Sequence, residues 1–137
     1  MAMLLMVMAS CATTRELTGN DMKCPDSPNC VSSQAPDARH FIEPFRFKDR
    51  PAAAMQRLRA AIIAEKRISI VSEQPDYLHA EVRSLLFRFV DDLEFRLLAE
   101  DGLIHVRSAA RTGYSDFGVN RRRIERIRRI FQGQQRP

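Results

Sequence analysis

The middle of the chain alternates between apolar and polar positions, a pattern that predicts several antiparallel strands. Every second residue is apolar or small in segments 77–89 and 103–111, and this period of two is typical of strands with one buried face. We expect turns at Asp91-Asp92 and at Glu100-Asp101-Gly102, because Asp-Gly readily adopts the positive φ of a tight hairpin. The expected strands cover residues 40–47, 68–72, 77–89, 93–99 and 103–111.

Two other segments have the three- and four-residue spacing of an amphipathic helix. The first follows Asp49, the expected cap, and places Met55, Leu58 and Ile62 on one side, with Pro51 in its first turn. The second combines an apolar stripe with six arginines. That stripe is expected to be Val119 or Ile124, then Ile127, Ile130 and Phe131. The order of elements predicts an α+β fold, with an antiparallel sheet of four to five strands and two helices packed on one face.

The N-terminus looks like the signal of a bacterial lipoprotein, because an apolar run at residues 1–8 ends in Ala9-Ser10-Cys11. Cys11 would then be the acylated first residue of a protein anchored in the cell envelope membrane, facing the periplasm or the exterior. The run is too short to cross a bilayer as a helix. A secretory leader normally has Lys or Arg before its apolar run, and here none precedes it. A cytoplasmic protein with an apolar N-terminus therefore stays an open alternative.

Composition divides the chain into residues 1–11, the signal, residues 12–23, a polar tether, and residues 24–134, a single domain. Residues 1–112 hold 15 Lys and Arg against 15 Asp and Glu, so the net charge of +5 comes from residues 113–137. We therefore expect a local basic surface on the last helix. It is either ordinary solvated surface or a contact for anionic lipid headgroups or another acidic partner. Nucleic acid fits poorly, because no aromatic stacking platform accompanies the arginines.

Two cysteines, Cys24 and Cys30, bracket the turn-rich sequence Pro-Asp-Ser-Pro-Asn, which can bring their side chains together. A disulfide is favoured in an oxidising compartment, and two free thiols or a zinc site remain open. Zinc needs two more ligands, and the three histidines do not show the spacing of a zinc motif. We expect no metal and no cofactor.

One face of the predicted sheet collects charged residues, and a function could lie there. Opposite charges on neighbouring strands usually form a solvated ladder. Alternatively, Arg83, Arg107 and Arg111 bind an anionic group, because guanidinium forks match carboxylate and phosphate. Leu85, Phe87 and Phe89 continue this face with apolar residues. Its polar members are Tyr77, His79, Glu81, Arg83, Glu94, Arg96, His105, Arg107 and Arg111.

Three segments, 24–33, 89–95 and 104–123, together resemble the bacterial family called domain of unknown function 1499. The resemblance spans about residues 24–131. It implies an exported, lipid-anchored or membrane-associated protein, and it brings no catalytic activity, cofactor or substrate. The motif positions that could form a site are Arg83, Asp91, Asp92, Arg107, Ser108, Arg111, Tyr114, Ser115, Asp116, Asn120 and Arg121.

Two hypotheses of different class follow. The first is a non-catalytic, membrane-tethered binding module for an anionic lipid, glycan or protein partner. The second is a hydrolase or transferase on an anionic substrate, with Asp91, Asp92 or Asp116 as general base and two arginines holding charge. The sequence lacks a GxSxG motif, a glycine-rich phosphate loop and HExxH, which favours the first. Its candidate binding residues are Arg83, Arg107, Arg111, Tyr114, Ser115, Asp116, Asn120 and Arg121.

Overall fold

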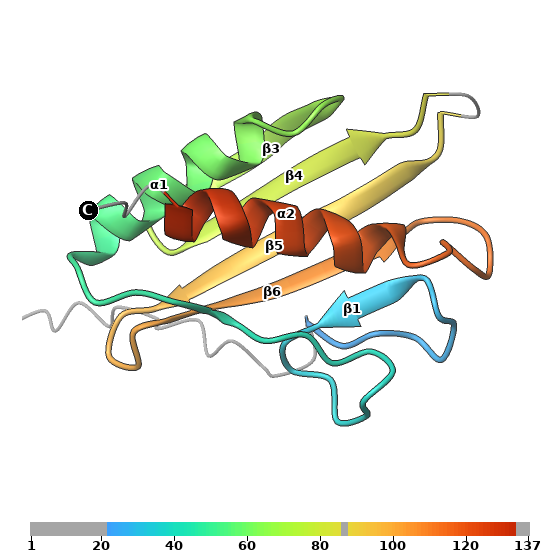
Figure 1. Cartoon of the computed structure of the whole chain (residues 1–137), viewed down its shortest axis with the longest axis horizontal. Helices are drawn as coiled ribbons and strands as arrows, with labels where there is room; N and C mark the ends of the chain where they lie inside the picture. Colours follow the sequence, from blue (N-terminus) through green and yellow to red (C-terminus); the bar gives the residue numbers. More distant parts are fainter. Residues whose placement is uncertain (1–21, 86–87, 134–137) are drawn as a thin grey trace, which may run out of the picture.

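The computed structural model describes residues 22–85 and 88–133, so the predicted signal, Cys11 and most of the tether lie outside the described residues. Six strands form one sheet, and both helices cover the same face of it (Figure 1). The α+β prediction is confirmed, with one strand more than expected. The elements are β1 (Cys30–Ser32), β2 (Phe45–Arg46), α1 (Pro51–Ile63), β3 (Ile68–Gln74), β4 (Tyr77–Arg83), β5 (Val90–Leu98), β6 (Leu103–Ala110) and α2 (Val119–Gly133).

The strands lie in the order β1-β6-β5-β4-β3, and β2 pairs with β6 on the same side as β1. All of these pairings are antiparallel. The predicted strand at 40–47 is reduced to the two residues of β2, with an isolated bridge from Phe41 to Ser32. β1 was not predicted, because three residues are too few to display an alternating pattern.

The predicted turn at Asp91-Asp92 is wrong, since both residues lie inside β5. Successive strand residues point to opposite faces, and each carboxylate finds a guanidinium group on its own face. Asp91 accepts a 2.8 Å hydrogen bond from Arg123 of α2, while Asp92 accepts hydrogen bonds from Arg111. An acidic pair is therefore accommodated within a strand, and the chain reverses between residues 83 and 90 instead.

The core lies between the sheet and the two helices. Phe45 packs edge-to-face against Phe95 at 5.8 Å and Phe131 at 5.4 Å between ring centroids, which links β2, β5 and α2. Small buried residues on the sheet, Ala80 and Ser108, leave room for the helices. The fully buried large side chains include Leu58, Ile62, Leu78, Leu93, Ile104, Val106, Ile124 and Ile127.

Helix α1 begins as the proline predicts but without the predicted cap. Pro51 occupies the first turn, and Arg50 is the N-cap residue without a side-chain hydrogen bond to the helix. Asp49 instead pairs with Arg57 in the second turn, so its predicted role as a cap is wrong. Within residues 22–85 and 88–133, neither helix is long and apolar enough to span a membrane.

Cys24 and Cys30 form a disulfide with 5.6 Å between their Cα atoms. This confirms the predicted pairing over the alternatives of free thiols or zinc. The bond closes the turn that leads into β1, and β1 pairs with β6 from Cys30 opposite Ala109. The disulfide therefore fixes the strand at one edge of the sheet.

Candidate functional site

The face of the sheet opposite the helices carries a network of ion pairs. Arg111 donates two hydrogen bonds to Asp92, from Nε to Oδ2 and from Nη2 to Oδ1, each 2.7 Å long, and another to Glu81. Arg107 donates to Glu94 at 3.3 Å. These two arginines are held by carboxylates of neighbouring strands, which is the arrangement of a cross-strand ladder.

Arg83, the third arginine predicted on this face, makes a weaker contact. Its guanidinium lies 3.5 Å from Glu81, and its side chain is mostly exposed. Tyr77 donates its hydroxyl proton to Glu94 at 3.2 Å, so the same carboxylates serve several donors. The positive charges of this face are therefore largely matched by its own acidic residues.

The pKa values on this face follow from the same contacts. Hydrogen bonds from Arg111, and then from His79, hold the pKa of Asp92 below its ordinary value despite partial burial. Asp92 and Glu81 in turn raise the pKa of Arg111. Partial burial lowers the pKa of His105, whose Nδ1 lies 2.9 Å from the Ser33 hydroxyl.

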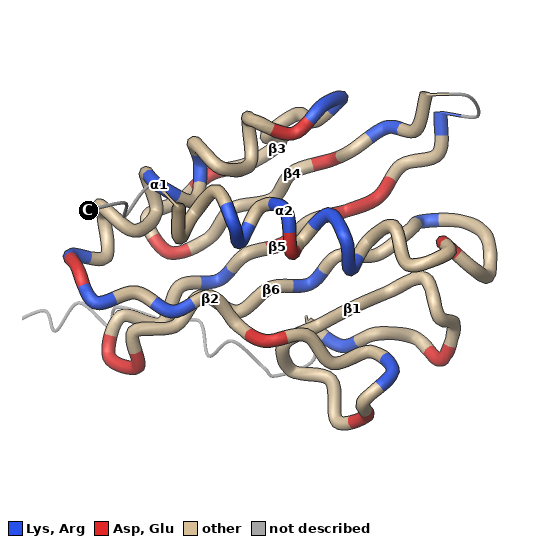
Figure 2. Tube along the Cα trace, viewed as in Figure 1, with Lys and Arg blue, Asp and Glu red and all other residues tan. Residues whose placement is uncertain are grey.

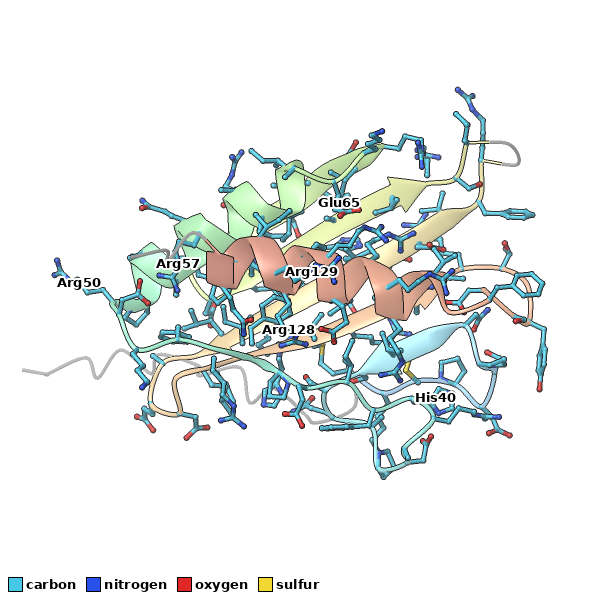
Figure 3. All side chains as sticks on the ribbon, viewed as in Figure 1. His40, Arg50, Arg57, Glu65, Arg128 and Arg129 are labelled. Carbon is cyan, nitrogen blue, oxygen red and sulfur yellow. A yellow bond between two sulfur atoms is a disulfide. The ribbon has the colours of Figure 1, made fainter. Side chains whose placement is uncertain are left out.

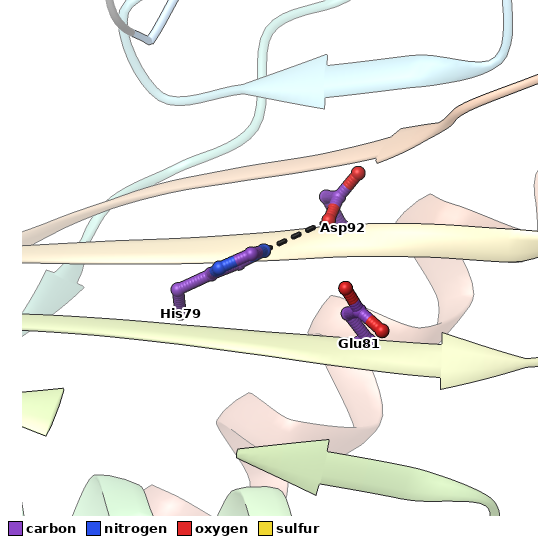
Figure 4. A group of neighbouring side chains, drawn as sticks. All are labelled: His79, Glu81 and Asp92. Atoms are coloured by element: carbon purple, nitrogen blue, oxygen red, sulfur yellow. Dashed lines mark hydrogen bonds and ion pairs between the residues drawn. The ribbon is translucent and has the colours of Figure 1, made fainter. Parts of the chain in front are cut away.

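Three side chains of β4 and β5, His79, Glu81 and Asp92, converge as potential metal ligands (Figure 4). Their ligand atoms lie within 4.8 Å of one another, and His79 Nε2 is 2.8 Å from Asp92 Oδ1. Arg111 already supplies a positive charge to both carboxylates. These three residues consequently have the ligand atoms of a metal site, but the Arg111 guanidinium would compete with a metal ion for the two carboxylates.

Hydrogen bonds with polar side chains hold the loop between β6 and α2, residues 111–118. Asp116 accepts hydrogen bonds from the backbone N–H groups of Gly118 at 2.8 Å and Asn120 at 3.1 Å, and from the Asn120 amide at 2.8 Å. Burial alone would raise the pKa of Asp116, but these hydrogen bonds outweigh it and lower the pKa. Asp116 therefore acts as the cap of α2.

Asn120 is fully buried and connects three elements. Its Oδ1 accepts a hydrogen bond from the Ser108 hydroxyl of β6 at 2.5 Å and one from Arg123 at 3.1 Å. Its amide also donates to the backbone oxygen of Asn29 at 3.4 Å. The side chain of Asn29 donates to the Gly113 carbonyl at 2.7 Å. The loop, β6, α2 and the segment before β1 are thus bonded together through two asparagines.

The remaining motif residues differ in their exposure. Ser115 accepts a 3.3 Å hydrogen bond from the Phe117 N–H, and Arg121 donates to the Arg39 carbonyl at 3.0 Å. Tyr114 is 70% exposed. Of the predicted binding residues, Ser115, Asp116 and Asn120 support the loop, whereas the Tyr114 ring faces solvent. Their role in binding stays a prediction.

The three candidate catalytic aspartates are not brought together. Asp91 faces the helices and pairs with Arg123, and Asp92 faces the opposite side of the sheet with Arg111. Asp116 caps α2 at the end of the loop. Each carboxylate is engaged by groups of the fold, and no contact among the described residues favours one of them as a general base.

The arginines of α2 fall into two groups. Arg123, Arg126 and Arg128 are engaged in the fold, and Arg128 reaches two backbone carbonyls beside β2 and lies 4.4 Å over the Phe45 ring (Figure 3). Within the described ranges, Arg121, Arg122 and Arg129 have no carboxylate partner. The basic residues succeed one another along α2 in Figure 2. This outer surface of α2 therefore carries unmatched positive charge, as the distribution of charge predicted.

Sequence reasoning gave no role to one exposed residue of the loop, Phe117. It is 86% exposed and has a φ of 53°, a backbone conformation that is uncommon for a bulky residue. The sequence carries no signal for this geometry beyond the capping residues around it.

The matched family agrees with the resemblance of the motifs. The model of the family described as protein of unknown function, DUF1499, matches residues 22–131. This protein therefore belongs to that family. No curated protein matches the chain.

Proposed function

We propose that this protein is a membrane-tethered, non-catalytic binding module of the cell envelope that recognises an anionic lipid, glycan or protein partner. The observation that carries the proposal is the outer surface of α2, where Arg121, Arg122 and Arg129 have no carboxylate partner among the described residues. Guanidinium groups left unmatched in this way remain available for phosphate, sulfate or carboxylate.

Helix energetics support a binding role for these arginines. The first turn of α2 contains no acidic residue, yet Arg121 and Arg122 lie in it and Arg123 follows directly. Positive charge at a helix N-terminus opposes the helix dipole. Only Arg123 gains a buried ion pair in return. Arg121 and Arg122 donate to backbone carbonyls, so no carboxylate among the described residues neutralises their positive charge.

Binding to a soluble polyanion tests this proposal on the full chain. The salt concentration that elutes the protein from heparin should fall in R122Q/R129Q, because released counterions set the salt dependence of such binding. A matched control, R46Q/R50Q, removes the same charge from exposed positions elsewhere in the fold. Figure 3 shows Arg50 at the beginning of α1, away from Arg129. Equal losses in both variants would leave only an effect of net charge and refute the proposed surface.

The tether has a test of its own. Mass spectrometry of the membrane fraction should find a chain that begins at an acylated Cys11. An intact Met1 on protein that stays in the soluble fraction would contradict the anchor and restore the cytoplasmic alternative. The α2 surface is tested independently by the heparin measurement.

A further inference from the structure

We infer that one end of the sheet docks onto the surface of an anionic lipid bilayer, with Phe117, Tyr114 and Phe89 entering the headgroup region. This inference rests on the proposed function and names the partner of the basic surface. The docking end consists of the loop 111–118, the residues Arg83, Ser84, Leu85, Arg88 and Phe89 that flank the β4–β5 reversal, and the connection 64–67 before β3.

Sheet register brings these segments to one end of the molecule. Arg83 at the end of β4 lies opposite Val90 at the start of β5, and Asp91 lies opposite Ala110 at the end of β6. The Arg111 N–H donates to the Val90 carbonyl at 3.0 Å. Figure 1 shows the β4–β5 reversal and the loop after β6 at the same end of the sheet.

Large apolar side chains are exposed on both segments at this end. The exposed fractions are 74% for Leu85, 54% for Phe89, 70% for Tyr114 and 86% for Phe117. Single exposed apolar residues are ordinary, but several at one end of a small domain mark an interaction surface. Aromatic rings with one polar edge are also favoured at the boundary between water and lipid.

Hydrogen bonds within the loop fix the backbone at Phe117, whose side chain is exposed to solvent. The Asp116 cap and the Ser115 hydroxyl bind the backbone on either side of Phe117, and Arg122 donates to the Phe117 carbonyl at 2.7 Å. These bonds maintain a left-handed backbone that costs a bulky residue free energy. A rigid loop that presents an aromatic ring to solvent, at a conformational cost, is suited to insertion.

Several cations at this end of the sheet have no acidic partner among the described residues. Lys66, Arg67, Arg88 and Arg122 make no ion pair among residues 22–85 and 88–133. Glu65, which precedes Lys66 in the chain, is engaged, because it pairs with Arg126. A depression of about 360 Å³ between the α1–β3 connection and α2 is lined by Lys66, Arg67, Val82 and Val119, together with Ala64, Glu65, Arg123 and Arg126.

Basic residues beside exposed apolar side chains favour a membrane surface as the partner. Basic residues attract anionic headgroups, and apolar side chains beside them enter the boundary of the acyl region. The rings project from two separate segments rather than lining a groove, so they suit a deformable surface better than a rigid protein partner. A headgroup phosphate can contact Lys66 and Arg67 while Val119 and Phe117 lie next to the lipid chains.

The absence of tryptophan from the chain allows a site-specific test on the full-length protein. F117W and F89W each introduce one fluorophore at the proposed end, and F41W introduces one at an exposed position outside it. Vesicles of phosphatidylglycerol and phosphatidylcholine with brominated acyl chains are the probe. We expect a shift of F117W and F89W emission to shorter wavelength with at least about twofold quenching, and no change for F41W. Vesicles of phosphatidylcholine alone should give no quenching.

The outcomes separate this inference from the proposed function. Unchanged F117W emission in a protein that sediments with the vesicles would overturn docking through this end, while salt-sensitive heparin binding would keep the proposed function. Equal quenching of F41W would also overturn it, because the orientation would then be random. Quenching of F117W that is the same on neutral vesicles would refute the selection of anionic lipid. K66Q/R88Q should reduce F117W quenching on anionic vesicles if the cations act as described.

Discussion

Arg111 and Asp92 form a forked ion pair on the face of the sheet opposite the helices, with two hydrogen bonds of 2.7 Å between guanidinium and carboxylate. The same guanidinium reaches Glu81. This pair joins the end of β6 to β5, and it places a positive charge where three potential metal ligands meet. Arg111 therefore has a structural role, because its charge is paired with carboxylates of its own sheet.

Replacing Arg111 with Gln should raise the pKa of Asp92. Because the folded pKa of Asp92 is lowered, the pair stabilises the fold above the unfolded value of about 3.9. This contribution is lost as the pH falls through the lower, folded value. An NMR titration of the Asp92 carboxyl carbon measures the change. R83Q is the matched control, since Arg83 contacts Glu81 and not Asp92, and an Asp92 titration that R111Q leaves unchanged would disprove the assignment.

Removing Arg111 should also expose the metal-binding potential of His79, Glu81 and Asp92. In R111A the two carboxylates lose their competing cation, and the three ligand atoms already lie close together. Zinc binding by R111A should be at least tenfold tighter than by wild type, measured by calorimetry, and should raise the melting temperature. The double variant H79A/R111A should lose this gain. Equal zinc affinity in wild type and R111A would show that Arg111 does not block the trio.

The buried Asn120 predicts a large loss of stability on truncation. N120A leaves the Ser108 hydroxyl and an Arg123 N–H without their acceptor in the interior. An unsatisfied buried polar group costs about 1–3 kcal/mol, and we expect the free energy of unfolding in urea to fall by that amount. Q56A, at an exposed position of α1, should change it by less than about 0.5 kcal/mol.

The cap of α2 predicts a pH-dependent effect of D116N. The hydrogen bonds to Asp116 lower its pKa, so the carboxylate stabilises the fold above the unfolded pKa of about 3.9. At pH 7, D116N should be less stable than wild type by about 1 kcal/mol, because an amide NH2 group replaces one of the two carboxylate oxygens that accept these hydrogen bonds. The difference should shrink as the pH falls through the folded pKa of Asp116. A difference that stays constant to pH 2.5 would contradict this account.

Reduction of the disulfide should destabilise the fold modestly. The bond closes a loop with a sequence separation of 6, and loop closure of this size is worth about 2 kcal/mol. Urea unfolding with and without dithiothreitol measures the difference. C24A should already have the lower stability and should not respond to the reductant. A C24A variant that still responds would assign the effect to another thiol.

The regular elements could be predicted because their patterns are long. Met55, Leu58 and Ile62 are buried on α1 as their spacing predicts, and the hairpin at Gly102 forms where Asp-Gly indicates. β1 escaped prediction, and the strand expected at 40–47 is reduced to the two residues of β2, because the pairing of both depends on contacts with β6, distant in sequence. Asp91 and Asp92 misled the prediction because their guanidinium partners come from other elements, which a local pattern does not reveal.

The sequence predicted which residues belong to the candidate site better than it predicted how they contact one another. The motif from residue 104 to 123 contains Asp116 and Asn120, whose side chains support the loop, and this supporting role depends on Ser108 and Asn29 from other elements. The opposite charges on β4, β5 and β6 predicted a ladder, and the contacts of Arg107 and Arg111 agree with it. The left-handed backbone of Phe117 depends on bonds from Ser115, Asp116 and Arg122, which no spacing rule anticipates.

The asparagine bonds beneath the loop 111–118 make its outer residues exchangeable. Asn29 and Asn120 hold the loop through hydrogen bonds to backbone oxygens. The side chain at position 114 takes no part in these bonds, so its identity contributes little to the loop conformation. The frame of the loop is thus separate from its exposed tip. The same separation makes the loop a convenient place to graft short recognition sequences onto a small, disulfide-closed scaffold.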